Sequence, residues 1–212
     1  KMIAPKLQES GRRVAVLLID ALRYELGVEL EKQLVDDGQV EINAAFAQLP
    51  SITPVGMASL LPGAGSELKL LRKEDQVVVA LGDQPLPQVT QRMDVLKKRF
   101  GDRFAEMSLT EFVRGKGKVD GGVELFVLRS TTIDQHMEST PEMALRLIHE
   151  SLKSIRVAIH KLRGLGFKDA FVVTDHGFYL NTATEAGDVC TKPQGKWINV
   201  HERCLLGDGV SD

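Results

Sequence analysis

The sequence of 212 residues has little of several features that would assign it to a particular class of protein. Its two cysteines, Cys190 and Cys204, form no C-x-x-C pair, so a zinc site built from thiolates is not expected. So few thiols fit a reducing compartment. No apolar run approaches the roughly 18 residues of a membrane-spanning helix, and no signal peptide is visible. The 27 basic and 29 acidic residues nearly balance, so charge does not predict nonspecific nucleic-acid binding.

Several common catalytic motifs are also absent. The sequence has no G-x-x-x-x-G-K-[ST], no G-x-G-x-x-G after a predicted strand and no G-x-S-x-G. The segments 149–150 and 201–202 begin like H-E-x-x-H, but neither continues to the second histidine. These absences argue against ATP-binding loops, dinucleotide folds, lipase-type hydrolases and zinc proteases of that motif.

The pattern of apolar residues predicts an α/β fold with a mostly parallel sheet. Composition is that of a globular protein, with 43% hydrophobic and 26% charged residues. The length fits one domain, and because the chain begins with Lys1 we interpret it as a piece of a longer protein. Continuous apolar runs such as Val14–Ile19 predict strands buried on both faces. We expect strands at 14–19, 40–46, 77–81, 124–128 and 170–173, helices at 22–34, 55–61, 89–104 and 141–165, and a loop at 131–138.

Three acidic residues stand just beyond predicted strand ends: Asp20, Asp134 and Asp175. In sheets of this kind, ligands bind outside the carboxyl ends of the strands. A buried carboxylate is costly unless it is paired or holds a metal, although a helix cap is the alternative for Asp20. The adjacent Asp175 and His176 offer an oxygen and a nitrogen to one ion, and Gly177 allows the backbone to approach closely.

A hydroxyl and two basic features complete the candidates. Thr53 precedes a predicted helix, where it caps the helix or helps to bind an anion such as phosphate. Arg23 lies one turn after Asp20 and either binds a phosphate oxygen or forms a structural ion pair. The basic segment 114–118 is a solvated loop or steers phosphate.

Four segments together resemble the PglZ family of the alkaline phosphatase superfamily. They are VLLIDALRYE (16–25), LPSITPVGMASLLPG (49–63), RSTTIDQHME (129–138) and FVVTDHGF (171–178). The resemblance covers roughly residues 13–205 and implies a domain over 13–207, with an inserted region at 64–122. It implies a three-layer α/β/α sandwich of alkaline phosphatase-like type. The implied activity is that of a phosphodiesterase or phosphatase with two divalent metal ions, zinc or, as a second choice, manganese.

The resemblance also implies roles for single residues. Thr53 is the implied nucleophile in preference to Ser51, because it stands ten positions before Gly63 as the superfamily's nucleophile commonly does. Position 138 is Glu where many relatives have His, so His136 is an alternative ligand. His149 and His160, on the long predicted helix, are expected at the surface. One ion would be held by Asp20, Thr53, Asp175 and His176, and the second by Asp134, Glu138 and His201.

Members of this family are associated with bacterial phage defence, and related domains occur in signalling proteins. The resemblance therefore implies a bacterial phage-defence or signalling protein in a cytoplasmic setting, with other defence proteins as partners. The implied substrate is a phosphoester, with nucleotides and nucleic acids left open. Two alternatives also stay open: a catalytically silent interaction module of a larger defence complex, and a phosphomutase.

Overall fold

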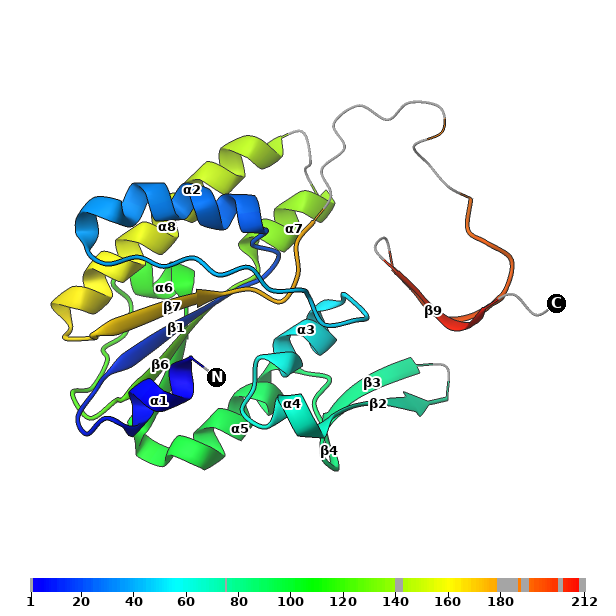
Figure 1. Ribbon diagram of the computed structural model, residues 1–212, viewed down its shortest axis with the longest axis horizontal. Helices are drawn as coiled ribbons and strands as arrows, with labels where there is room; N and C mark the ends of the chain where they lie inside the picture. The colour runs from blue at the N-terminus through cyan, green and yellow to red at the C-terminus, as the bar shows by residue number, and fades with distance from the viewer. Residues whose placement is uncertain are drawn as a thin grey trace.

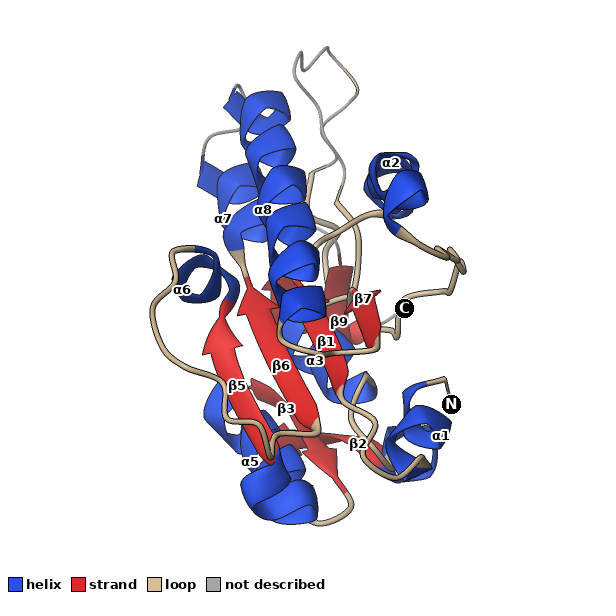
Figure 2. Ribbon diagram, turned by 90° about the vertical axis from the view of Figure 1, so that its left-hand side faces the viewer, coloured by secondary structure: helices blue, strands red, loops and turns tan. Residues whose placement is uncertain are grey.

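The fold is built on a four-stranded parallel sheet with the order β5-β6-β1-β7. In this computed structural model the described residues are 2–74, 76–139, 143–178, 187, 191–201 and 204–209, without the side chains at 138–139, 144–145 and 199–201. All strand pairs of the sheet are parallel, so their carboxyl ends meet at one edge (Figure 2). The strands are β1 (Val14–Ile19), β5 (Phe104–Ser108), β6 (Leu125–Ser130) and β7 (Asp169–Val173).

Helices cover both faces of this sheet, which confirms the predicted three-layer α/β arrangement. Figure 1 shows α2, α7 and α8 on one side of the sheet and α1, α3 and α5 on the other. None of the described helices combines the length and apolarity needed to cross a bilayer. The helices are α1 (Ile3–Gln8), α2 (Tyr24–Leu34), α3 (Thr53–Ser59), α5 (Val89–Phe100), α6 (Leu109–Val113), α7 (Thr132–Ser139) and α8 (Ala144–Gly164), with single 3₁₀ turns at Val35–Asp37 and Gly101–Arg103.

The central strand β1 joins two apolar clusters. Successive side chains of a strand point to opposite faces. Accordingly Ala15, Leu17 and Ile19 pack with α2, α6, α7 and α8, whereas the alternate residues Val14, Val16 and Leu18 pack with α3 and α5. All six are buried, as the unbroken apolar run predicts.

Two smaller antiparallel sheets lie outside the main one. The first follows α4 (Ala64–Glu67) and the second lies near the end of the chain. Part of the predicted inserted region 64–122 forms this first sheet, whereas α5 and β5 belong to the main fold. The bounds of the insertion stay a prediction. The strands are β2 (Leu68–Lys73), β3 (Gln76–Leu81) and β4 (Gln84–Pro85), then β8 (Lys196–His201) and β9 (Cys204–Gly209).

Two predicted elements were wrong, and a third, a helix, was given the wrong C-terminal end. Residues 40–46 form no strand: no described strand pairs with them, and Phe46 is fully exposed (105%), so β propensity finds no surface to pack on. The helix predicted to reach 104 ends at Phe100, because Gly101 takes a left-handed φ of 57° and terminates it before β5. Residues 132–139 form α7 instead of a loop, with Ile133 buried against α8.

Candidate metal centre

The ends of two neighbouring strands, β1 and β7, deliver a pair of buried carboxylates to one place. Asp20 directly follows β1, and its N–H donates to the Ser130 carbonyl at 2.9 Å, which extends the pairing with β6. Asp175 follows β7, the other neighbour of β1. Their exposed fractions are 2% and 4%, and that of His176 is 3%. One ligand atom from each of these three residues lies within 4.8 Å of the others, which makes them the one group of metal-ligand type among the described residues.

The histidine ring is oriented for coordination. His176 Nδ1 lies 2.9 Å from the Gly177 carbonyl oxygen. Because that oxygen only accepts, Nδ1 carries the proton of the neutral ring and Nε2 keeps its lone pair. Nε2 faces Asp20 Oδ1 at 3.5 Å and Asp175 Oδ2 at 3.4 Å. Three acceptors that face one another in this way are favourable when a cation lies between them.

Thr53 brings a hydroxyl to the same cluster. Its Oγ1 lies 3.2 Å from His176 Nε2 and 3.5 Å from Asp20 Oδ1. Thr53 is the first residue of α3, the N-cap is Ile52, and no side chain caps this helix. The hydroxyl is therefore directed at the cluster. It does not cap the helix, which was the other role considered for Thr53 from the sequence.

The donor set fits a zinc-like ion. Ligand atoms about 2.0–2.1 Å from a tetrahedral zinc ion lie about 3.3 Å from one another. His176 Nε2 lies 3.2 to 3.5 Å from the Thr53, Asp20 and Asp175 oxygens, and Thr53 Oγ1 lies 3.5 Å from Asp20 Oδ1, so these four separations match that spacing. Asp175 Oδ2 is buried and accepts no hydrogen bond from the described residues, an arrangement that is costly without a positive partner. Mixed imidazole and carboxylate ligands suit zinc, with manganese as the second choice.

The other oxygen of Asp175 is held by the backbone. Asp175 Oδ1 accepts hydrogen bonds from the N–H groups of Ala21 at 3.3 Å and His176 at 3.0 Å. Burial raises the pKa of the Asp175 carboxyl above its usual 3.8, while the charge that His176 carries when its ring is protonated, and these hydrogen bonds, oppose the shift. Ala21 adopts a left-handed φ of 58°, which costs about 1–2 kcal/mol for a residue with a Cβ. This strained turn directs the Ala21 N–H at the carboxylate.

Gly56 allows α3 to approach the cluster. A Cβ at this position would lie 2.6 Å from Asp175 Cβ and 3.0 Å from the Asp175 carbonyl oxygen. Any larger residue would therefore push α3 away from Asp175. The sequence reasoning missed this contact, although a glycine inside a short predicted helix is a usable signal of close packing.

Among the described residues, the proposed ligands of a second ion form no cluster like that of Asp20, Asp175 and His176. Asp134 lies in the first turn of α7, directly after β6, and so at the same edge of the sheet as Asp20. His136 is two residues further along α7. The side chains of Glu138 and His201 lie outside the described part of the chain. The second site therefore stays a prediction.

The described side-chain hydrogen bonds of Arg23 are those of a structural ion pair. Arg23 donates two hydrogen bonds to Glu25, both at 2.7 Å, and these raise the pKa of the guanidinium and lower that of Glu25 to about 2. His149 and His160 are exposed, as expected.

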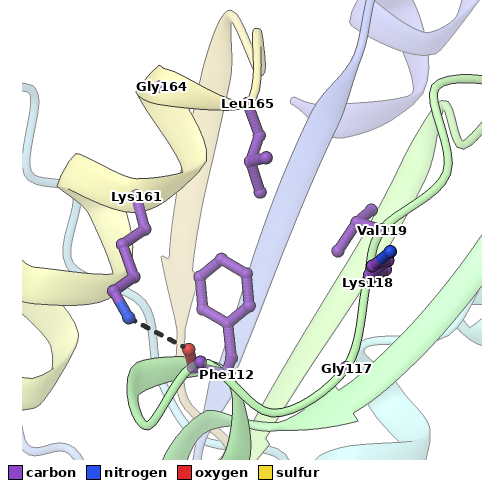
Figure 3. A pocket seen from close by; sticks show the side chains of 8 residues that line it. Phe112, Gly117, Lys118, Val119, Lys161, Gly164 and Leu165 are labelled. Atoms are coloured by element: carbon purple, nitrogen blue, oxygen red, sulfur yellow. Dashed lines mark hydrogen bonds between the residues drawn. The ribbon is translucent and has the colours of Figure 1, made fainter.

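The loop at 114–118 borders a hollow at the C-terminal end of α8 (Figure 3). The chain passes from this end of α8 to the amino end of β7. There Lys161 donates to the carbonyls of Phe112 and Val113 at the end of α6. This position, at the opposite end of β7 from Asp175, favours the solvated-loop interpretation of the segment.

Fold and site together define a parallel α/β domain with a buried acid–histidine–hydroxyl cluster at its strand ends. The family model described as the BREX system PglZ alkaline phosphatase-like domain matches residues 1–212. The chain therefore belongs to the PglZ family, as the four sequence segments had indicated.

Two relatives are similar to this chain. It is 28% identical over 193 residues to the alkaline phosphatase-like protein PglZ of Bacillus cereus (strain H3081.97), covering 85% of this chain and 22% of the relative. It is 28% identical over 221 residues to the alkaline phosphatase-like protein BrxZ of Escherichia coli O9:H4 (strain HS), covering 98% and 25%. The chain thus spans about a quarter of the length of these relatives. No solved structure matches it.

Proposed function

We propose that this domain is a metal-dependent phosphoester hydrolase, a phosphodiesterase or phosphatase, with Thr53 as its nucleophile. The observation that carries the proposal is the set of four donor atoms, from Asp20, Thr53, Asp175 and His176, at ligand-like separations. Membership of a BREX-system family supports a role in phage defence beside other proteins of that system. The substrate class we propose is a phosphoester, which includes nucleotides and nucleic acid.

The chemistry assigns one task to each side chain. A divalent ion held by Asp20, Asp175 and His176 would lower the pKa of the Thr53 hydroxyl and act as a Lewis acid. Thr53 Oγ1 loses its proton and attacks phosphorus, and the bond from phosphorus to the leaving oxygen breaks, with that oxygen leaving as the alcohol once protonated. A monoester then gives a phosphothreonine, whereas a diester gives a threonine phosphodiester such as a nucleotidyl-threonine. Water hydrolyses the bond from this intermediate's phosphorus to Thr53 Oγ1 and regenerates the hydroxyl. A second ion, held by Asp134, Glu138 and His201 in this proposal, would suit the leaving oxygen, since two-metal sites clamp both ends of such a displacement.

Metal content and turnover test the proposal together. We expect the purified chain, supplied with zinc, to bind the ion and hydrolyse bis-p-nitrophenyl phosphate, and Asp175→Asn to lose both. Asp83→Asn is the matched control, because that carboxylate is exposed in the turn between β3 and β4. Zinc binding without turnover in the unmodified chain would favour the catalytically silent module. Absence of zinc binding would refute the proposed centre.

A further inference from the structure

A buried arginine accompanies the acidic cluster. Among the residues that the structure describes, four polar or charged side chains are buried: Asp20, Arg92, Asp175 and His176. Three of them form the candidate metal centre, and Arg92, 7% exposed, is the one cation in the set. A buried charge is normally retained only with a partner of opposite sign. Among the described residues no direct ion pair joins Arg92 to either carboxylate, so its opposite charge acts on theirs over a longer distance.

Arg92 lies on the face of the sheet that α3 and α5 cover, and toward the edge where the strands end and the metal centre lies. Arg92 stands in the first turns of α5, the helix that precedes β5. A helix that leads into a parallel strand runs back along it, so its N-terminal end lies toward the carboxyl ends of the strands. Together with Met93 and Leu96, Arg92 occupies the buried stripe of α5. Those two neighbours belong to the apolar cluster that also contains Leu18 and Val173, each two residues before an acid of the centre.

The hydrogen bonds of Arg92 leave much of its charge uncompensated. Nη1 donates to the carbonyls of Leu86 at 3.1 Å and Pro87 at 3.2 Å, and these contacts anchor the side chain without neutralising it. Burial lowers the pKa of Arg92, and the charges of Asp175 and Asp20 act in the opposite direction. Arg129, another cation that acts on Arg92, is ion-paired with Glu106 at 2.6 Å.

We infer that Arg92 is the built-in countercharge of the metal centre, a positioning residue that stabilises the Asp20–Asp175 carboxylates while the site holds no ion. A second consequence, the effect of Arg92 on metal affinity, rests on the metal binding proposed above. Because the arginine and a divalent ion repel each other, the same charge that stabilises the empty site lowers its affinity for metal. Arg92 therefore sets a compromise between folding without metal and binding metal tightly.

The first test is a double-mutant cycle on the metal-free chain in a chelator. Arg92→Met should lower the melting temperature by roughly 5–10 °C, as expected for a buried charge left without its partner in a domain of this size. In the Asp20→Asn background, where one negative charge is gone, the same substitution should lower it by about half as much or less. Additive effects of the two substitutions would overturn the inference.

The second test is zinc affinity, and it separates a countercharge from a simple anchor. Arg92→Met should bind zinc roughly tenfold more tightly than the unmodified chain, since one nearby charge shifts such an equilibrium by about one order of magnitude. Arg13→Met is the matched control, because Arg13 also donates to backbone carbonyls, those of Val123 and Asp120, but beside the amino end of β1. It should lower stability equally with and without Asp20 and leave zinc affinity unchanged.

Unchanged or weaker zinc binding in Arg92→Met would overturn the inference. If the unmodified chain binds no zinc, the proposed function fails, and the cycle in chelator still decides the role of Arg92.

Discussion

Replacing Gly56 by alanine tests how closely the candidate nucleophile must approach the acids. The new Cβ would lie 2.6 Å from Asp175 Cβ, whereas ordinary contacts begin at 3.4 Å. Either α3 or the Asp175 turn must therefore move by about 0.8 Å, and Thr53 lies one helical turn before Gly56. A displacement of about 1 Å at a reacting group can cost about 100-fold in rate.

The helix itself should not be weakened by this change. Alanine is favoured over glycine inside a helix by about 1 kcal/mol, so the metal-free chain should remain folded by circular dichroism. We expect zinc affinity to fall about 10-fold, within the range typical for groups that orient metal ligands, and hydrolysis of bis-p-nitrophenyl phosphate to fall by 10- to 100-fold.

Gly65→Ala is the control for this prediction. Gly65 lies in α4, has no positive φ, and a Cβ there would meet nothing within 4 Å. That variant should bind zinc and turn over substrate as the unmodified chain does. Wild-type zinc affinity and turnover in Gly56→Ala would refute the argument that this contact sets the geometry of the centre.

Four other predictions concern this centre and the proposed second site. Asp175→Asn should abolish tight zinc binding with little loss of fold, as measured by calorimetric titration; unchanged affinity contradicts the assignment. Because the pKa of Asp175 is raised, its contribution to metal-free stability is fully present below about pH 3.8 and is lost as the pH rises through the raised value, so Asp175→Asn should flatten this dependence in thermal unfolding scans. Thr53→Ala should abolish phosphodiester hydrolysis, whereas Ser51→Ala should leave most of it; the reverse result would move the nucleophile to Ser51. A second ion near Asp134 should bind more weakly than the first, and full occupancy at low zinc, measured by anomalous scattering from crystals, would contradict this.

The sequence by itself determined the main architecture. An unbroken apolar strand such as β1 can be buried only between two layers, so its composition already requires helices on both faces of the sheet. A parallel sheet also places the residues that follow its strands at one edge. These two facts predict from the sequence alone that Asp20 and Asp175 lie close together. His176 directly follows Asp175, so its ring nitrogen is expected at the same place.

The tertiary structure alone decided which other residues reach that edge. No local pattern shows that Gly56 packs on the Asp175 backbone or that Ala21 takes a left-handed turn, because both follow from contacts between segments distant in sequence. Arg92 occupies an apolar position of its helix. Its proposed role as a countercharge depends on two acids, each more than 70 residues away along the chain, one in either direction. The segment 40–46 has strand-like residues but no described neighbour to pair with, and a strand exists only where another backbone completes its hydrogen bonds.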